Sequence, residues 1–153
     1  MKTNFTFIVF CFSLLNFSCS KSATDSAPTP AENFSAMIDS EKYSDNTAYI
    51  SPAVGGTIAI FSKDAKGRTF TVAIFEKDFP LNKAINIAFS PSISFANENK
   101  ETFIAKSGTM TISAYEKSST GILNKITGTF TFVGTGGKKD VNITAGKFSV
   151  SKK

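Results

Sequence analysis

Side chains that could carry out acid–base, nucleophilic or metal chemistry are few in this 153-residue chain. It has two cysteines and no histidine, which removes the commonest general base and metal ligand, together with every Ser-His-Asp or Cys-His arrangement. Carboxylate pairs are the remaining route to catalysis. Glu76 and Asp78 could share a strand face, but Lys77 between them and nearby Pro80 favour the surface end of a strand. The composition therefore predicts a protein that is not an enzyme and has no cofactor.

Two polar clusters suggest ligands only superficially. Asp39, Glu41 and Asp45 lack the Asp-x-Asp-x-Asp-Gly order of calcium-binding loops, so we expect a solvated loop and no metal. Gly134–Lys139 (GTGGKK) suggests a phosphate loop, but a P-loop has Ser or Thr after its lysine and then a helix. A second lysine and a strand-like segment follow here. This glycine-rich segment is predicted to be a hairpin loop.

Aromatic side chains offer a different chemistry, the stacking of rings on sugars. The rings that do not fit an inward-facing strand position are Tyr43, Tyr49, Tyr115, Phe75 and Phe79. Exposed together, they would form a carbohydrate-binding platform, for which Tyr43, Tyr49 and Tyr115 are the candidate ligand-binding residues. The alternative is that they cover the edge of a β-sandwich, and the absence of tryptophan favours this alternative.

The start of the chain has the order of an export signal. Lys2 provides a positive end, an apolar run extends from Phe5 to Leu15, and small Ser18 precedes Cys19. Charge, apolar core and small-residue cleavage site in that order predict a secretory signal peptide over residues 1–18. As a helix, Asn4–Phe17 would reach only about 20 Å, too short for a hydrocarbon core of about 30 Å.

A cysteine at the cleavage point resembles the lipobox of bacterial lipoproteins, in which the thiol receives a diacylglycerol and the new amino terminus is acylated. The resemblance implies lipidation of Cys19 and a membrane anchor. Asn16 stands where the usual pattern has a branched aliphatic residue, so an ordinary signal peptide with an incidental Cys19 is the alternative. Cys11 would leave with the peptide, and no cysteine pair would remain for a disulfide.

Residues 19–32 are predicted to be a flexible tether, because Ser20–Glu32 has no large apolar side chain and contains two prolines. Asp25-Ser26-Ala27 resembles the sequon of bacteroidete O-glycosylation, which makes Ser26 a candidate glycosylation site; a chance tripeptide is the alternative. By resemblance to lipoprotein sorting, Ser20 implies the outer membrane, and the single early acid Asp25 implies its periplasmic face.

Residues 33–153 are predicted to be one all-β domain, an antiparallel β-sandwich or open barrel of about eight or nine short strands. Apolar and polar residues alternate in seven segments, each predicted to be a strand: Phe34–Ile38, Thr57–Phe61, Arg68–Phe75, Ile85–Phe89, Thr109–Tyr115, Lys125–Val133 and Val141–Val150. Ile93–Phe95 and Phe103–Ala105 are shorter candidates. Pro91 is expected to end a strand, Gly67 to make a turn, and Ala114 to face inward. The 16 phenylalanines predict an aromatic core.

A change of phase in the last strand predicts a β-bulge. Val141 and Ile143 are odd-numbered whereas Phe148 and Val150 are even-numbered, so strict alternation cannot place all four on one face. One extra residue at Ala145-Gly146 restores the phase, and Gly146 is expected to accommodate it.

Four segments of this domain are similar to an uncharacterised family of small bacteroidete lipoproteins with a β-sandwich. They are FSAMID at 34–39, SGTMTI at 107–112, ITGTFTF at 126–132 and VNITAGKF at 141–148. The resemblance implies a fold and no activity.

We therefore expect a lipid-anchored, non-enzymatic binding or structural module of the cell envelope, with an envelope protein or glycan as its partner. A glycan- or peptide-binding accessory lipoprotein and a carboxylate-dependent hydrolase are the alternatives. The net charge of +5 is spread along the chain and interleaved with acids, so no nucleic-acid partner is expected.

Overall fold

Ten β-strands account for most of the chain in the computed structural model, which describes residues 33–52, 57–75, 80–87, 90–137 and 139–153. They are β1 (Phe34–Ile38), β2 (Glu41–Asp45), β3 (Tyr49–Pro52), β4 (Thr57–Lys63), β5 (Thr69–Phe75), β6 (Ala84–Asn86), β7 (Ser90–Ala96), β8 (Thr102–Lys117), β9 (Leu123–Gly136) and β10 (Lys139–Lys152). The prediction of an all-β fold of the sandwich or open-barrel kind is confirmed.

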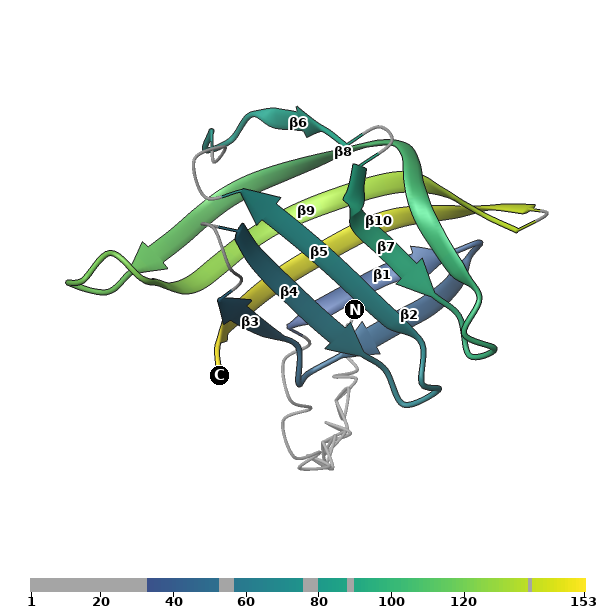
Figure 1. Cartoon of the computed structure of the whole chain (residues 1–153), viewed down its shortest axis with the longest axis horizontal. Helices are drawn as coiled ribbons and strands as arrows, with labels where there is room; N and C mark the ends of the chain where they lie inside the picture. Colours follow the sequence, from purple (N-terminus) through teal and green to yellow (C-terminus); the bar gives the residue numbers. More distant parts are fainter. Residues whose placement is uncertain (1–32, 53–56, 76–79, 88–89, 138) are drawn as a thin grey trace, which may run out of the picture.

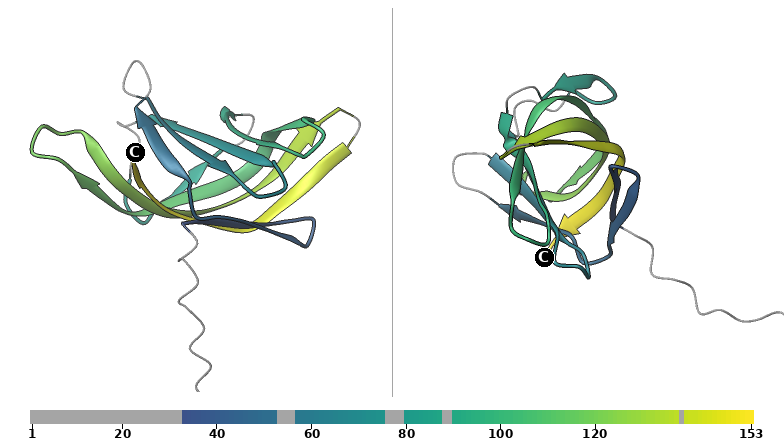
Figure 2. Two further views of the ribbon diagram at one scale, coloured as in Figure 1. Left: turned by 90° about the horizontal axis from the view of Figure 1, so that it is seen from below. Right: turned by 90° about the vertical axis from the view of Figure 1, so that its right-hand side faces the viewer.

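The strand pairings form a ring. β3, β4, β5, β7, β8, β9 and β10 pair in that order, and two parallel pairs, Ser151 with Tyr49 and Lys152 with Ile50, join β10 back to β3. Figure 2 shows the ring most clearly in its right-hand view, and in Figure 1 β3, β4 and β5 lie in front of the long strands β8, β9 and β10. The β1–β2 hairpin extends the sheet beside β10, and β6 pairs with β8.

The strands are more numerous than predicted, and three are long. β8 has 16 residues, and β9 and β10 have 14 each. β8 unites the predicted Phe103–Ala105 and Thr109–Tyr115 segments. Its register shifts between Ala105 and Ser107, so the inward side chains change from odd to even numbers and one strand resembles two in the sequence.

Two local predictions were wrong. Ala114 is exposed, because β8 shifts register again after Ile112 and extends beyond the core. Pro91 does not end a strand but lies within β7, in the irregular stretch between the pairs Ser90–Ala105 and Ser94–Ile104. A proline has no N–H to donate to a ladder and is tolerated at such an irregularity.

The turn predictions are confirmed. β4 and β5 form a hairpin in which Gly67 has a φ of 81°. The backbone N–H groups of Lys66 and Arg68 donate to the Asp64 carboxylate at 3.0 and 2.9 Å, which closes this turn. The glycine-rich segment joins β9 to β10 as a hairpin, with Gly134 and Gly136 inside β9 itself.

The predicted bulge in β10 is confirmed. Ile143 pairs with Phe132 and Gly146 with Phe130, so three steps on β10 match two on β9. The four side chains whose numbers change phase (Val141, Ile143, Phe148 and Val150) are all buried. The residue with positive φ is Ala145, at 49°, and not Gly146.

The inside of the ring is packed with aromatic rings, as predicted. The largest wholly buried side chains include Tyr43, Phe34, Phe70, Phe95, Phe103 and Phe130. Phe70 on β5 lies near the middle of them, with its ring centroid 4.8 Å from that of Tyr43 and 5.0 Å from that of Phe95.

The described part of the chain includes no helix that could cross a membrane.

Candidate functional site

The outward side of β3, β4 and β5 carries exposed aromatic rings. Tyr49 on β3 pairs directly with Phe61 on β4, and Phe61 pairs with Thr71 on β5. Directly paired side chains lie on the same face of a sheet, and Ile60 beside Phe61 is buried, so this row faces outward. The Tyr49 and Phe61 rings lie 5.8 Å apart, and Phe61 is 37% exposed.

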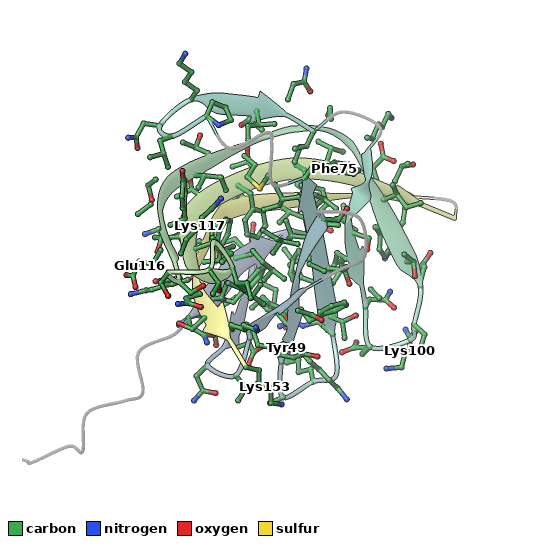
Figure 3. All side chains as sticks on the ribbon, turned by 60° about the vertical axis from the view of Figure 1, so that its left-hand side comes forward. Tyr49, Phe75, Lys100, Glu116, Lys117 and Lys153 are labelled. Atoms are coloured by element: carbon green, nitrogen blue, oxygen red, sulfur yellow. The ribbon has the colours of Figure 1, made fainter. Side chains whose placement is uncertain are left out.

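A third ring completes what we call the outer aromatic face, defined by Tyr49, Phe61 and Phe75. Phe75 is 49% exposed and pairs with Thr57, four residues before Phe61 on β4. At about 3.3 Å per residue the two rows are about 13 Å apart. Small Ala59 and Ala73 form the row between them. Figure 1 shows no other described element in front of β4 and β5, and Figure 3 shows Tyr49 and Phe75 well separated along this side.

A groove of about 340 Å³ lies at the Tyr49 end of this face. Its lining combines three rings with hydroxyl and charged groups: Asp45, Thr47, Tyr49, Phe61, Ser62, Lys63, Thr69, Phe70 and Thr71. Lys153 stands beside it, with its Nζ 5.0 Å from the centre of the Tyr49 ring (Figure 3). An apolar surface with a few polar groups at its rim is the usual composition of a small-ligand site.

Asp45 is the carboxylate of this groove, and its role is structural. One oxygen accepts from the N–H and hydroxyl of Thr47, both at 2.7 Å. The other accepts from the Ser62 hydroxyl at 2.9 Å and the Lys63 N–H at 2.8 Å. Burial alone would raise the pKa of Asp45, but these hydrogen bonds together lower it below its usual value. The ionised side chain ties the end of β2 to β4.

Tyr43 does not belong to an exposed platform, contrary to the sequence hypothesis. Its relative exposure is 0% and its ring packs edge-on against Phe34 and Phe70. Since the Ser62 hydroxyl donates to Asp45, the Tyr43 hydroxyl donates to Ser62, at 2.8 Å. Burial raises the pKa of this phenol. Tyr43 was misassigned because β2 is too short to show which of its faces is buried.

Tyr115 is exposed but lies apart from the groove. It lies near the end of β8, beyond the packed interior. There it pairs with Ile126, whose own side chain points into the core. The Lys117 Nζ lies 5.6 Å from the centre of its ring. Tyr49 lies on the outward face, so the structure does not bring the three predicted tyrosines together. Phe79, Glu76, Asp78, Cys19 and Ser26 lie outside the described residues.

A second hollow, of about 270 Å³, lies at the mouth of the ring and contains Asp39, Glu41 and Glu98 among its lining residues. Glu41 pairs with Lys66 and with Arg68 Nη1, the latter at 3.2 Å. The hydrogen bond from Lys66, with the charges of both cations, lowers the pKa of Glu41. A general acid needs a raised pKa, so Glu41 does not favour the hydrolase alternative.

The buried cation at this mouth, Arg68, is already engaged. Its Nε lies 2.7 Å from Asp64, and its Nη2 donates to the Lys42 carbonyl at 2.9 Å. Asp39 and Glu41 both line this hollow, and Asp39 accepts the Asn142 N–H at 2.8 Å. Asp45 is buried beneath the groove instead. The three acids of the sequence cluster therefore do not form one loop site. Among the described residues no group of three or more His, Cys, Asp or Glu could hold a metal ion.

Phe61 is the aromatic residue of the groove that the sequence did not single out as a ligand-binding candidate. The sequence does contain the sign that Phe61 faces outward, because Ile58 and Ile60 alternate inward in the same segment and leave Phe61 on the opposite side.

Comparisons with protein-family models, with curated proteins and with solved structures find no match to this chain.

Proposed function

We propose that this protein is a lipid-anchored, non-enzymatic module of the cell envelope that binds saccharide on the outer aromatic face. The observation that supports this most directly is the pair of outward rings, half-buried Tyr49 and exposed Phe61, at a groove rimmed by threonine hydroxyls. A sugar ring has an apolar C–H face that packs on an aromatic ring, and outward hydroxyls that need hydrogen-bond partners. Thr69 and Thr71 provide such partners, and the Thr47 hydroxyl, which donates to Asp45, can still accept a hydrogen bond.

The length of the face suits a chain of sugars. Phe61 and Phe75 are separated by about 13 Å along the strands, and the row between them on β4 and β5 consists of two small side chains, the buried Ala59 and the half-buried Ala73. A short oligosaccharide could therefore stack on Phe61 and Phe75 at once. The two stacking contacts would both add to the binding free energy, whereas the entropy lost on binding would be smaller than for two separate sugars.

Binding should depend on the Phe61 ring. Phe61→Ala removes the most exposed ring of the groove, and we expect affinity for a bound oligosaccharide to fall about 10-fold, as for a central aromatic contact. The chain has three tyrosines and no tryptophan, so its emission comes from tyrosine, and Tyr49 is the one in the groove that a bound sugar would contact. Tyr115→Phe removes a signal from outside the groove and is the matched control, with no change in affinity. If no saccharide in a panel of neutral and acidic oligosaccharides alters the emission, this function is wrong.

The anchor is proposed to be the acylated Cys19 at the outer membrane, on its periplasmic face. In a bacterium that processes lipoproteins, wild-type protein should incorporate labelled palmitate and sediment with membranes, whereas Cys19→Ser should lose both properties. Cys11→Ser is the matched control and should retain the label, since that residue is expected to leave with residues 1–18. Labelling that persists in Cys19→Ser would refute the anchor.

A further inference from the structure

We infer that the outer aromatic face prefers an acidic saccharide, one that carries carboxylate groups on its sugar rings, over a neutral one. This inference rests on the proposed function and names the class of ligand. It follows from which charged groups around the groove are free to meet a ligand and which are already used within the protein.

Cations stand at two sides of the groove. Lys63 follows Phe61 on the same outward side of β4 and is exposed. Lys153 lies over the Tyr49 ring, so its ammonium is next to any group that stacks on Phe61 (Figure 3). Its position on the ring is stabilised by cation–π attraction, which holds the charge at the site before a ligand arrives.

The anion of the groove cannot serve a ligand in the same way. An ionised carboxylate has about four lone-pair sites, and Asp45 uses four in bonds to Thr47, Ser62 and Lys63. Asp45 therefore offers no acceptor to a cationic or hydroxyl-rich ligand, while both lysines retain donors. Charged donors meeting an anion form stronger hydrogen bonds than those meeting a neutral hydroxyl.

Oligonucleotides share the combination of negative charge and stackable rings, but single-strand binders follow the backbone with a continuous basic groove. Here Lys63 and Lys153 flank one pair of rings, and Thr69 and Thr71 lie next to Lys63 and Phe61 on β5. This pattern suits one carboxylate on a stacked sugar better than a run of phosphates.

The test compares oligogalacturonate with its methyl ester, which has the same sugar skeleton without the charges. Calorimetry on the full chain measures the affinity for each. Oligogalacturonate should bind about 10-fold more tightly than the ester at low salt, with each lysine contributing about threefold. Raising NaCl should remove most of this difference, since the lysines are exposed.

Lys63→Gln and Lys153→Gln should each weaken binding of the acid about threefold and leave binding of the ester unchanged. Lys100→Gln, in the distant β7–β8 turn (Figure 3), should affect neither.

The outcomes separate the two proposals. Equal binding of acid and ester, lost in Phe61→Ala, would overturn the acidic preference and leave the saccharide site standing. Tighter binding of the acid that neither lysine substitution weakens would also overturn the inference, because the charge would then act elsewhere. Binding of neither sugar, or tighter binding of an oligothymidylate than of the acid, would overturn both proposals.

Discussion

Phe70→Ala is expected to lower the free energy of unfolding by about 4 kcal/mol, the usual range for deleting a buried ring. The Phe70 side chain is wholly buried, and five other rings lie around it, with centroids 4.8–6.3 Å away: Phe34, Tyr43, Phe95, Phe130 and Phe132. These rings come from β1, β2, β7 and β9, so the cavity would weaken contacts on every side of the barrel. Urea unfolding followed by circular dichroism measures the change.

The matched control is Phe75→Ala, which deletes the same ring on the same strand but from the outward face. Because Phe75 is half exposed, we expect a change within about 0.5 kcal/mol. A domain of this size has a total stability of only about 5–15 kcal/mol, so Phe70→Ala could leave too little folded protein to measure. Phe70→Leu then serves instead and should cost about 1–2 kcal/mol. Equal effects at positions 70 and 75 would contradict the assignment of inner and outer faces.

Alternation of side chains was enough to predict the class of fold and much of its core. Phe34, Phe70 and Phe130 each stand in a segment with a clear two-residue repeat, and each is buried. The β10 bulge was also predictable, because a phase change between two well-marked halves of a strand can be read directly from residue numbers.

The closing of the ring could not be predicted in the same way. It depends on which strands become neighbours, and the β10–β3 contact joins segments about 100 residues apart through two parallel pairs. The register shift after Ala105 hid the continuity of β8, since a bulge with few apolar residues on each side looks like a turn. Local sequence carries little information about such long-range pairings.

The candidate site was predicted only in part, for a related reason. Tyr49 and Phe75 were recognised as rings without an inward position, whereas Tyr43 was grouped with them although it is in the core. What distinguishes Tyr43 is its partner, the Ser62 hydroxyl 19 residues away, which satisfies the phenol in the interior. A tyrosine can be buried wherever its hydroxyl finds such a partner, and the sequence does not show where the partner will be.

Gly146→Ala is expected to lower the free energy of unfolding by roughly 3 kcal/mol, the upper end of the usual cost of over-packing. A Cβ at this position would lie 2.5 Å from the Phe130 carbonyl oxygen and 2.6 Å from its ring. The oxygen belongs to the neighbouring strand β9, so it cannot move without disturbing the β9–β10 ladder, and the ring is part of the core. The role of Gly146 is thus to let two strands approach at the bulge, and urea unfolding measures its contribution.

The neighbouring residue provides a control of opposite sign. Ala145 holds the positive φ of the bulge, a conformation that costs an L-residue about 1–2 kcal/mol and glycine almost nothing. Part of this gain is lost because glycine gives the unfolded chain more freedom, so Ala145→Gly should raise the free energy of unfolding by about 0.5 kcal/mol. A neutral Gly146→Ala would contradict the close approach of the two strands at Gly146. A clearly destabilising Ala145→Gly would contradict the assignment of the strained conformation to Ala145.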